Sequence, residues 1–513
     1  MKALAVLYGG NLSGQAFEEV FPGTSALNSA LERAASFPGV ARITLLLDQA
    51  APDPALKAPL PGLEIRRQPR WTHKGLLDAL AELAGGYDLT YYAWADCPLL
   101  DPSLAGALMK RHLRYAAEYT YADGWPYGFA PELLAPGVAA ILAKIWGDAD
   151  GPVERDALFQ AIQKDINAFD IETEIAPTDL RSHRLSLSAD SRRNLMLLRS
   201  LTGAGLSGAG DADKFIAEKP ALLRTLPSFY AIQAARPCPR PCPLCPYPLL
   251  KQPGAAEDFM EPARFAALLD KIEAFSGDAV IDLSLWGEIA LHPRKMEIFT
   301  LVLSRPALSL IIETSGLGWK REEIEALAAA AFAPDCKPRL NRMAPLSWIV
   351  SLDAADSAPA PGAAFSAGAD CAKLLTGLFP KDAYVQAVRV QGEEDAAERF
   401  YRSWKEAGAN IIIQKYDDFC GFLPKRQASD LSPVKRQPCW HLMRDMNILL
   451  DGSVPRCRED LAVMEGTGPA LGSAFDEPLE TIWSRGEEAY RDQCAGRYEG
   501  ICGCCDEYYT FNF

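Results

Sequence analysis

The stretch of sequence that decides the fold is Arg236-Pro-Cys-Pro-Arg-Pro-Cys-Pro-Leu-Cys-Pro246. Proline fixes φ and removes a backbone donor, so we expect this stretch to be a loop and not a helix interior or a central strand. Its C-x3-C-x2-C spacing holds the thiols of Cys238, Cys242 and Cys245 close together. Three cysteine ligands on a cubane iron–sulfur cluster leave one iron without a protein ligand, whereas four-cysteine sites are closed. The stretch therefore predicts a cluster with one iron open to a substrate or cosubstrate.

A disulfide loop and a zinc knot are the alternative interpretations of these cysteines. Nothing in residues 1–10 resembles a signal peptide, so we expect a cytoplasmic, reducing environment in which disulfides are rare. Zinc needs a fourth ligand, but the next cysteine is Cys336 and no histidine lies in the loop. The spacing therefore favours iron and sulfur.

Composition and charge limit the classes of function that this chain can have. A chain of 513 residues is too long for one hydrophobic core, so several domains are expected. The net charge of −15 argues against nucleic acid or an anionic membrane surface as the main partner. No apolar run approaches the roughly 20 residues of a membrane span. All 13 cysteines except Cys97 follow residue 237, which predicts metal or redox chemistry in the C-terminal part.

Predicted strands and helices alternate from residue 228 onward. The strands are expected at 228–233, 279–286, 308–314, 348–353, 384–390 and 410–415. The helices are expected at 261–275, 293–304, 321–332 and 393–407, the first with Phe265, Leu268, Leu269 and Ile272 on one face. Such alternation predicts an α/β fold with parallel strands and right-handed crossovers, whose sites lie at the carboxyl ends of the strands.

Polar motifs follow three of these strands, namely Trp286-Gly-Glu-Ile-Ala-Leu-His-Pro293, Glu313-Thr-Ser-Gly316 and Ser351-Leu-Asp353. In this order behind the cysteine loop, they resemble the radical SAM enzymes. The resemblance implies a [4Fe-4S] cluster with an open iron that binds S-adenosylmethionine (SAM). The residues it assigns to SAM binding are Gly287, Glu288, Thr314, Ser315, Ser351 and Asp353.

Some roles follow from the resemblance alone. The turn at Gly287 and Glu288 is expected to bind the SAM amino group, and the Ser351 hydroxyl to approach the ribose. Trp286 stands where the family usually has glycine, so the approach of this turn to SAM is expected to differ. The implied reaction is electron transfer to SAM, supplied by a flavodoxin- or ferredoxin-type donor, followed by hydrogen abstraction from the substrate.

A second group of cysteines lies near the C-terminus. Cys439 and Cys457 flank Gly452, and a glycine between two ligand cysteines suits a β-hairpin turn that brings them onto one metal. With Cys502 and Cys505 they resemble the SPASM domain or its shorter twitch form, which implies one auxiliary [4Fe-4S] cluster. Zinc is the alternative for a four-cysteine set. Cys494 and Cys504 are left without a role.

The first two hundred residues resemble sugar nucleotidyltransferases. A predicted strand at 89–95 ends in Asp96-Cys-Pro-Leu-Leu-Asp101, and the resemblance makes Asp96 a candidate Mg²⁺ ligand. The loop 9–24 contains no lysine or arginine to neutralise a triphosphate. We therefore expect a nucleotidyltransferase-like fold that recognises a ligand without transferring nucleotides.

The order of the parts resembles the spiro-SPASM family over nearly the whole chain. It implies an α/β multidomain protein: a nucleotidyltransferase-like sheet domain at 1–200, a linker at 201–224, a partial (β/α)6 radical SAM barrel at 225–428 and a SPASM/twitch domain at 429–513. The expected substrate is a peptide or protein, or else a sugar nucleotide. The alternative function is a sugar-nucleotide nucleotidyltransferase with a C-terminal metal-binding module.

Overall fold

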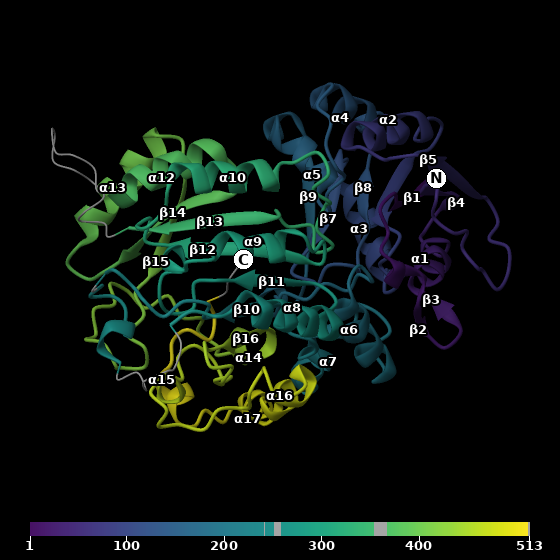
Figure 1. Cartoon of the computed structure of the whole chain (residues 1–513). Helices are drawn as coiled ribbons and strands as arrows, with labels where there is room; N and C mark the ends of the chain where they lie inside the picture. The colour runs from purple at the N-terminus through teal and green to yellow at the C-terminus, as the bar shows by residue number, and fades with distance from the viewer. Residues whose placement is uncertain (241, 251–257, 353–366, 511–513) are drawn as a thin grey trace. The chain divides into compact units, whose positions relative to one another are not determined.

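The computed structural model describes residues 1–240, 242–250, 258–352 and 367–510. The chain divides into two compact units, Met1–Leu222 and Leu223–Phe513. Each unit is built on a seven-stranded sheet covered by helices (Figure 1). None of the helices in the described ranges has the length and apolar character that a membrane crossing requires.

The sheet of the first unit has the strand order β5-β4-β1-β6-β8-β7-β9. These strands are, in that order, Leu63–Gln68, Val40–Asp48, Ala3–Gly9, Leu89–Trp94, Glu132–Leu134, Tyr119–Asp123 and Ile171–Ile175. The four strands from β5 to β6 are parallel, and β8 runs antiparallel to both of its neighbours. Every residue of β1 and β6 is buried, as expected for central strands of a sheet covered on both faces.

The other elements of the first unit are a hairpin, seven α-helices and four 3-10 turns among the described residues. They are a β2–β3 hairpin (Glu19–Phe21, Thr24–Ser25), α1 (Ala26–Ala34), α2 (His73–Leu83), α3 (Pro102–Tyr115), α4 (Val138–Trp146), α5 (Ala157–Gln163), α6 (Arg192–Gly203), α7 (Ala212–Glu218), and the 3-10 turns η1 (Gly14–Phe17), η2 (Ile166–Ala168), η3 (Arg181–His183) and η4 (Pro220–Leu223). The segment expected as a linker at 201–224 holds the end of α6, all of α7 and η4, with Leu206, Ala212 and Ile216 buried.

The second unit has an all-parallel sheet in the order β15-β14-β13-β12-β11-β10-β16. In chain order, β10 to β16 are Phe229–Ile232, Ala279–Asp282, Leu308–Thr314, Leu346–Ser351, Ala383–Arg389, Asn410–Lys415 and Asp445–Ile448. The six strands predicted from the alternating pattern are confirmed, and β16 is an additional strand beside β10. Within the described residues the edge strands β15 and β16 do not pair, so the sheet stays open.

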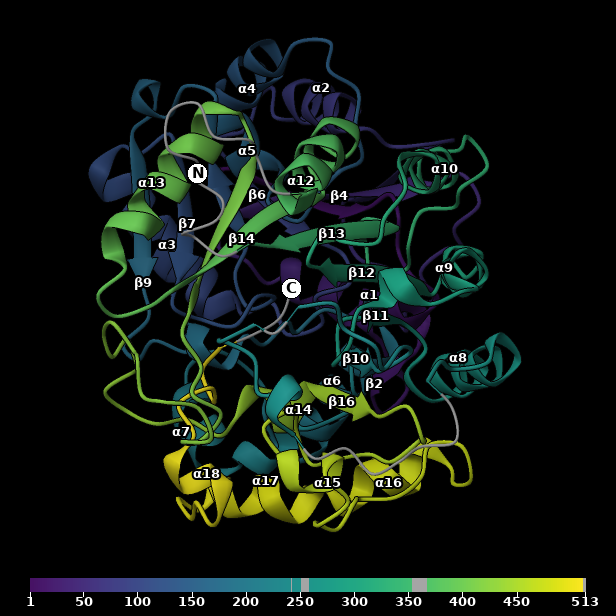
Figure 2. The same ribbon diagram turned by 60° about the vertical axis from the view of Figure 1, so that its left-hand side comes forward.

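Helices fill the crossovers between successive strands of this sheet. They are α8 (Pro262–Ser276), α9 (Lys295–Leu303), α10 (Arg321–Ala331), α12 (Ala367–Leu378) and α13 (Glu394–Glu406). The predicted apolar face of α8 is buried in the core, where Phe265 and Ile272 join Phe299 of α9 and Trp348 of β13. Figure 2 shows α8, α9 and α10 side by side along the outer face of β11–β13.

The C-terminal elements complete the same unit. They are α14 (Trp440–Arg444), α15 (Leu461–Met464), α16 (Leu479–Arg485), α17 (Glu487–Cys494) and α18 (Ile501–Cys504). The expected turn at Gly452 is present, with φ of 90°, and the Leu449 amide donates to the carbonyl of Ser453 at 2.9 Å. Because β16 pairs with β10, the segment 429–513 shares a sheet with the segment before it.

Candidate cofactor-binding site

A cavity of about 670 Å³ lies at the carboxyl ends of the second unit's strands. Its lining contains the three predicted cluster ligands and all but one of the predicted SAM-binding residues: Cys238, Cys242, Cys245, Gly287, Glu288, Thr314, Ser315 and Ser351. Asp353, the remaining predicted residue, lies outside the described residues. The structure therefore brings together eight predicted site residues that are spread over more than a hundred positions of sequence.

The cysteine loop is fixed at both ends. The Cys245 amide donates to the Cys242 carbonyl at 3.3 Å, which closes a turn between these two thiols. Near its start, the Tyr247 hydroxyl donates to the Arg236 carbonyl at 2.7 Å. Burial raises the pKa of Cys245 to about 11, and the neighbouring Cys242 and Cys238 add to the increase. A metal that binds here must therefore displace protons, as thiolate-binding metals generally do.

The turn after β11 needs glycine at position 287. A Cβ on Gly287, whose φ is 82°, would lie 2.1 Å from the carbonyl oxygen of Ala235. Trp286 also has a positive φ of 52°, a conformation that suits glycine better. Its indole packs against Tyr247 and Phe419, with ring centroids 6.0 and 5.7 Å apart. Tryptophan therefore adds an aromatic wall beside the cysteine loop.

Glu288 is the buried acid of the cavity, with 3% of its surface exposed. Its backbone amide donates to the Pro237 carbonyl at 2.8 Å, which ties the turn to the cysteine loop. Its carboxylate accepts from the Thr314 hydroxyl at 2.8 Å and from the Ser315 amide and hydroxyl at 2.8 and 2.7 Å. Burial raises the pKa of Glu288 even though these donors lower it. A buried carboxylate whose pKa is raised in this way would gain from a cation placed beside it.

A second acid in the cavity, Glu313, is one that the sequence analysis had not selected. Its carboxylate accepts from the Ser351 hydroxyl at 2.6 Å and from the Gln386 amide at 2.9 Å. Gln386 is also 2.8 Å from the Ser351 hydroxyl, so the three side chains form one network. Two features of the sequence could have indicated this network. Glu313 begins the motif that follows the third predicted strand, and a glutamine stands within the apolar strand β14.

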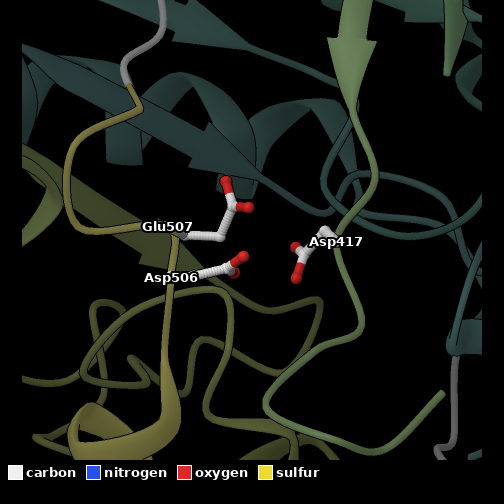
Figure 3. A group of neighbouring side chains, drawn as sticks. All are labelled: Asp417, Asp506 and Glu507. Carbon is white, nitrogen blue, oxygen red and sulfur yellow. The ribbon is translucent and has the colours of Figure 1, made fainter. Parts of the chain in front are cut away.

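Charged side chains form another wall of the cavity. Figure 3 shows Asp417 facing Asp506 and Glu507, whose carboxylate oxygens lie within 4.8 Å of one another. Lys415 pairs with Glu507 and, at 3.0 Å, with Asp506, while Arg458 pairs with Asp417 at 3.0 Å. Two cations therefore already neutralise most of this acidic cluster, which is a salt-bridge network and not a fitted site for a divalent metal.

Three of the four predicted auxiliary ligands interact with one another. Burial raises the pKa values of Cys439 and Cys457, and the charge of Cys505 raises both further. Cys502 is bonded through its backbone: its amide donates to the Glu499 carbonyl at 3.3 Å, and its carbonyl accepts from the Arg436 side chain at 2.6 Å. The other three thiols are all buried or half-buried, and thiols are the ligands that iron–sulfur clusters take in proteins.

The predicted metal ligand of the first unit, Asp96, has a charged partner within the chain. Asp96 is fully buried, and both of its oxygens accept from Arg155, at 2.7 and 2.6 Å. Arg155 also donates to Asp190 at 2.9 Å. Asp101 instead caps α3, accepting from the amides of Ser103 and Leu104. These residues do not fit the predicted Mg²⁺ site at Asp96, because an arginine already occupies the coordinating edge of the carboxylate.

The glycine turn of the first unit is also filled. A Cβ on Gly10 would lie 2.5 Å from the Trp71 ring and 2.6 Å from the Tyr8 hydroxyl. Trp71 is held there because its indole N–H donates to the Leu47 carbonyl at 2.8 Å. Side chains of the protein thus occupy the space directly beside Gly9 and Gly10.

Three comparisons place the chain among known proteins. No protein-family model matches it. It is similar to the solved structure of BtrN in complex with AdoMet and 2-DOIA, with 16% sequence identity, a TM-score of 0.35, and coverage of 56% of this chain and 93% of BtrN. It is also similar to a cytidylyltransferase from Leptospira borgpetersenii serovar Hardjo-bovis, with 17% identity, a TM-score of 0.35, and coverage of 43% and 95%.

A relative in Treponema pallidum (strain Nichols), described as an uncharacterized protein, is much closer in sequence. The two chains are 37% identical over 368 residues, which make up 69% of this chain and 98% of the relative. This chain therefore belongs to the same protein family as that Treponema pallidum protein.

Proposed function

We propose that this chain is a radical SAM enzyme that holds a [4Fe-4S] cluster on Cys238, Cys242 and Cys245. The observation that carries the proposal is that these three thiols line the same cavity as the buried carboxylate of Glu288. Among the described residues that line this cavity there is no fourth cysteine, so a cubane held here keeps one iron open. When bound, the reduced cluster and SAM supply a 5′-deoxyadenosyl radical that abstracts hydrogen from carbon.

The residues around the thiols have separate tasks in this proposal. The Glu288 carboxylate accepts a charge-assisted hydrogen bond from the SAM ammonium, and the Gly287 backbone leaves room for it. Thr314 and Ser315 hold that carboxylate in place. Ser351, positioned by Glu313 and Gln386, turns its hydroxyl toward the ribose. Asp353, which follows β13, is proposed as a further SAM contact.

The substrate is proposed to be a peptide or protein, or else a sugar nucleotide. The wall formed by Lys415, Asp417, Arg458 and Glu507 offers both donors and acceptors to a polar substrate. We assign one auxiliary [4Fe-4S] cluster to the C-terminal cysteines, where it exchanges an electron with the product radical or holds the substrate. A flavodoxin- or ferredoxin-type protein is the proposed electron donor. The first unit is proposed to recognise a ligand without transferring nucleotides.

Anaerobic reconstitution tests this function. The purified protein is reconstituted with iron and sulfide, reduced with dithionite and incubated with SAM, and 5′-deoxyadenosine is then measured together with iron per chain. We expect the protein to take up iron and to form 5′-deoxyadenosine from SAM. A protein that takes up less than about one iron per chain and forms no 5′-deoxyadenosine contradicts the proposal. Comparison of peptides and metabolites in a deletion strain then identifies the substrate class.

A further inference from the structure

The cavity wall beside the cysteine loop contains an aromatic ring that is not buried. Among the described residues that line the cavity, the phenylalanine, tyrosine and tryptophan side chains are Phe229, Tyr247, Trp286, Tyr416 and Phe419. Four of these residues are at most 7% exposed, and Trp286 alone is partly exposed. The indole of Trp286 is therefore the aromatic surface that a ligand in the cavity can reach.

Two buried rings hold Trp286 in place. Tyr247 lies nearly parallel to the indole, with ring planes 9° apart and centroids 6.0 Å apart, and its hydroxyl donates to the Arg236 carbonyl at 2.7 Å. Phe419, in the loop after β15, packs on the indole at a centroid distance of 5.7 Å and an angle of 45°. Its amide donates to the Asp417 carboxylate at 2.8 Å. The fold therefore holds the indole in a defined position.

The backbone at Trp286 is strained. Its φ of 52° lies in the left-handed region that favours glycine, and Phe419 has the same φ. Strain of this kind persists only where the surrounding structure imposes it, and it is concentrated at functional sites. Because glycine would relieve the strain at position 286, the presence of a tryptophan there favours a role of the indole in binding over a role in the fold alone.

The surroundings of the indole are apolar, whereas those of Glu288 are polar. Trp286 packs on the apolar cluster that contains Leu285 and Ile349. A charge is costly to bury among such residues, but the face of a neutral heterocycle is not. Glu288, two positions along the chain, accepts hydrogen bonds from neutral donors and would gain from a cation. A ligand with an ammonium group at one end and a flat neutral ring at the other therefore suits both residues.

We propose that the indole of Trp286 is the surface on which the adenine of SAM stacks. This inference rests on the proposed function, because it takes SAM to be the ligand of the cavity. Stacking of a base on an aromatic side chain stabilises binding without any hydrogen bond to the base. Trp286 would then position the nucleoside end of SAM while Glu288 binds its ammonium group. A glycine at position 286 would offer no such surface.

Anaerobic calorimetric titration of the reconstituted full-length protein with three ligands tests this role. They are SAM, 5′-methylthioadenosine, which keeps the adenine but has neither the sulfonium nor the ammonium, and methionine, which keeps the ammonium but lacks the adenine. Trp286→Gly suits the positive φ and should weaken the binding of SAM and of 5′-methylthioadenosine roughly tenfold. Its affinity for methionine and its iron content should equal those of the unaltered chain. Trp286→Phe, which keeps a ring, should retain most of the affinity for all three ligands.

The matched control is Phe422→Ala, which removes an exposed ring that does not line the cavity and should leave all three affinities unchanged. The proposal is overturned if Trp286→Gly binds SAM and 5′-methylthioadenosine as tightly as the unaltered chain, or if the unaltered chain does not bind 5′-methylthioadenosine. It is also overturned if only SAM binding weakens, because the ring would then contact the sulfonium, or if methionine binding weakens equally, because the turn itself would then be displaced. Failure of the proposed function is distinguishable, since the unaltered chain would then bind no SAM.

Discussion

Two buried acids, one in each unit, follow the carboxyl end of a parallel strand and have opposite surroundings. Asp96, after β6, is fully buried and paired with Arg155 through both oxygens. Glu288, in the turn after β11, is 3% exposed and is hydrogen-bonded by neutral donors of Thr314 and Ser315. Among the described residues, no lysine or arginine is among the groups that shift the pKa of Glu288 most strongly. At this strand-end position the chain supplies a cation to the acid in the first unit and only neutral donors in the second.

The difference has an electrostatic consequence. A buried carboxylate without a cation is costly to ionise, which is why burial raises the pKa of Glu288. A cationic ligand would remove that cost, so the second site gains from binding an ammonium. The first site has no such deficit, because Arg155 already supplies the positive charge, and its own pKa is raised by Asp96 although burial opposes this. The comparison predicts that ligand chemistry resides in the second unit.

The largest expected effect is at the cysteine loop. Cys238→Ala, Cys242→Ala and Cys245→Ala should each abolish SAM cleavage, because a cubane with two protein ligands is not held. Iron per chain should fall by about half if both sites carry cubanes, with the auxiliary cluster left in place. The measurements are 5′-deoxyadenosine formation and iron content. Loss of all iron in any one variant would show that the two sites depend on each other.

The next effect is on the stability of the first unit. Arg155→Met leaves the buried Asp96 without a counter-charge and should destabilise this unit by about 3–5 kcal/mol. Hydrogen exchange in β1 and β6 of the full-length chain measures the loss. The matched control is Arg181→Met, since Arg181 pairs with Asp123 and Asp179 at the surface and such pairs contribute about 0–1 kcal/mol.

A second substitution checks the cause. Asp96→Asn, added to Arg155→Met, should recover much of the lost protection because no buried charge then remains. Equal protection in Arg155→Met and the unaltered chain would contradict the view that Asp96 is neutralised from within. The same view would be contradicted if the chain released pyrophosphate from a nucleoside triphosphate and a sugar phosphate, and if this release disappeared in Asp96→Ala.

Stability of the second unit should depend on pH through Asp282. Burial is the main cause that raises the pKa of this 7% exposed carboxyl from 3.8 to about 7, and nearby Glu313 adds to it, while hydrogen bonds from Ser284 lower it. The native state therefore keeps a proton that the unfolded chain loses near pH 4. Native stability then falls as the pH rises from about 4 to 7, by about 4 kcal/mol from this group, and no further above that range.

Asp282→Asn removes this titration. Relative to the unaltered chain, the variant should gain about 4 kcal/mol of unfolding free energy between pH 4 and 7.5. Denaturant unfolding at both pH values measures the difference, with Asp270→Asn on the exposed side of α8 as the control. A difference that stays constant with pH would mean that Asp282 ionises normally in the folded protein.

Much of the second unit was predictable because its strands are apolar runs separated by amphipathic helices. The cavity residues Glu288, Thr314 and Ser351 were selected through the resemblance to radical SAM enzymes, and parallel topology brings them together because they stand at strand ends. Strand β16 was missed since Asp445 and Asn447 interrupt its apolar pattern. Both residues are buried and line the cavity. The polar residues that interrupt the strand pattern in the sequence therefore belong to the site.

The missed site residues have a common physical reason. Arg155 lies in an irregular segment, and its partners Asp96 and Asp190 are 59 and 35 positions away. Lys415 and Arg458 are single charges that look solvent-exposed in sequence and acquire partners only through the fold. Periodicity and local spacing carry no information on such pairs. Asp96 shows the converse, because a motif at a strand end predicted a metal ligand and tertiary structure supplied an arginine.

The smallest expected effect is on SAM affinity at Glu288. Glu288→Gln removes the negative charge and one acceptor but keeps the shape of the side chain. A charge-assisted hydrogen bond to an ammonium contributes about 1.5–3 kcal/mol, so affinity for SAM should fall roughly tenfold to a hundredfold. Calorimetric titration of the reconstituted protein measures the change, and iron content should remain that of the unaltered chain because Glu288 is not a cluster ligand.

The control for this prediction is Glu297→Gln on α9, which removes an acid of the same unit that pairs with Arg294 and is half exposed. It should leave SAM affinity unchanged, since this exposed ion pair is screened by solvent and takes no part in the chemistry of the cavity. Glu288 also caps the turn η6 (Ile289–Leu291), accepting from the Ala290 amide at 3.4 Å. If Glu288 has only a structural role, Glu288→Gln should lower the thermal stability of the protein and leave its SAM affinity unchanged. That result would remove the contrast with Asp96, because both acids would then be satisfied by their own chain.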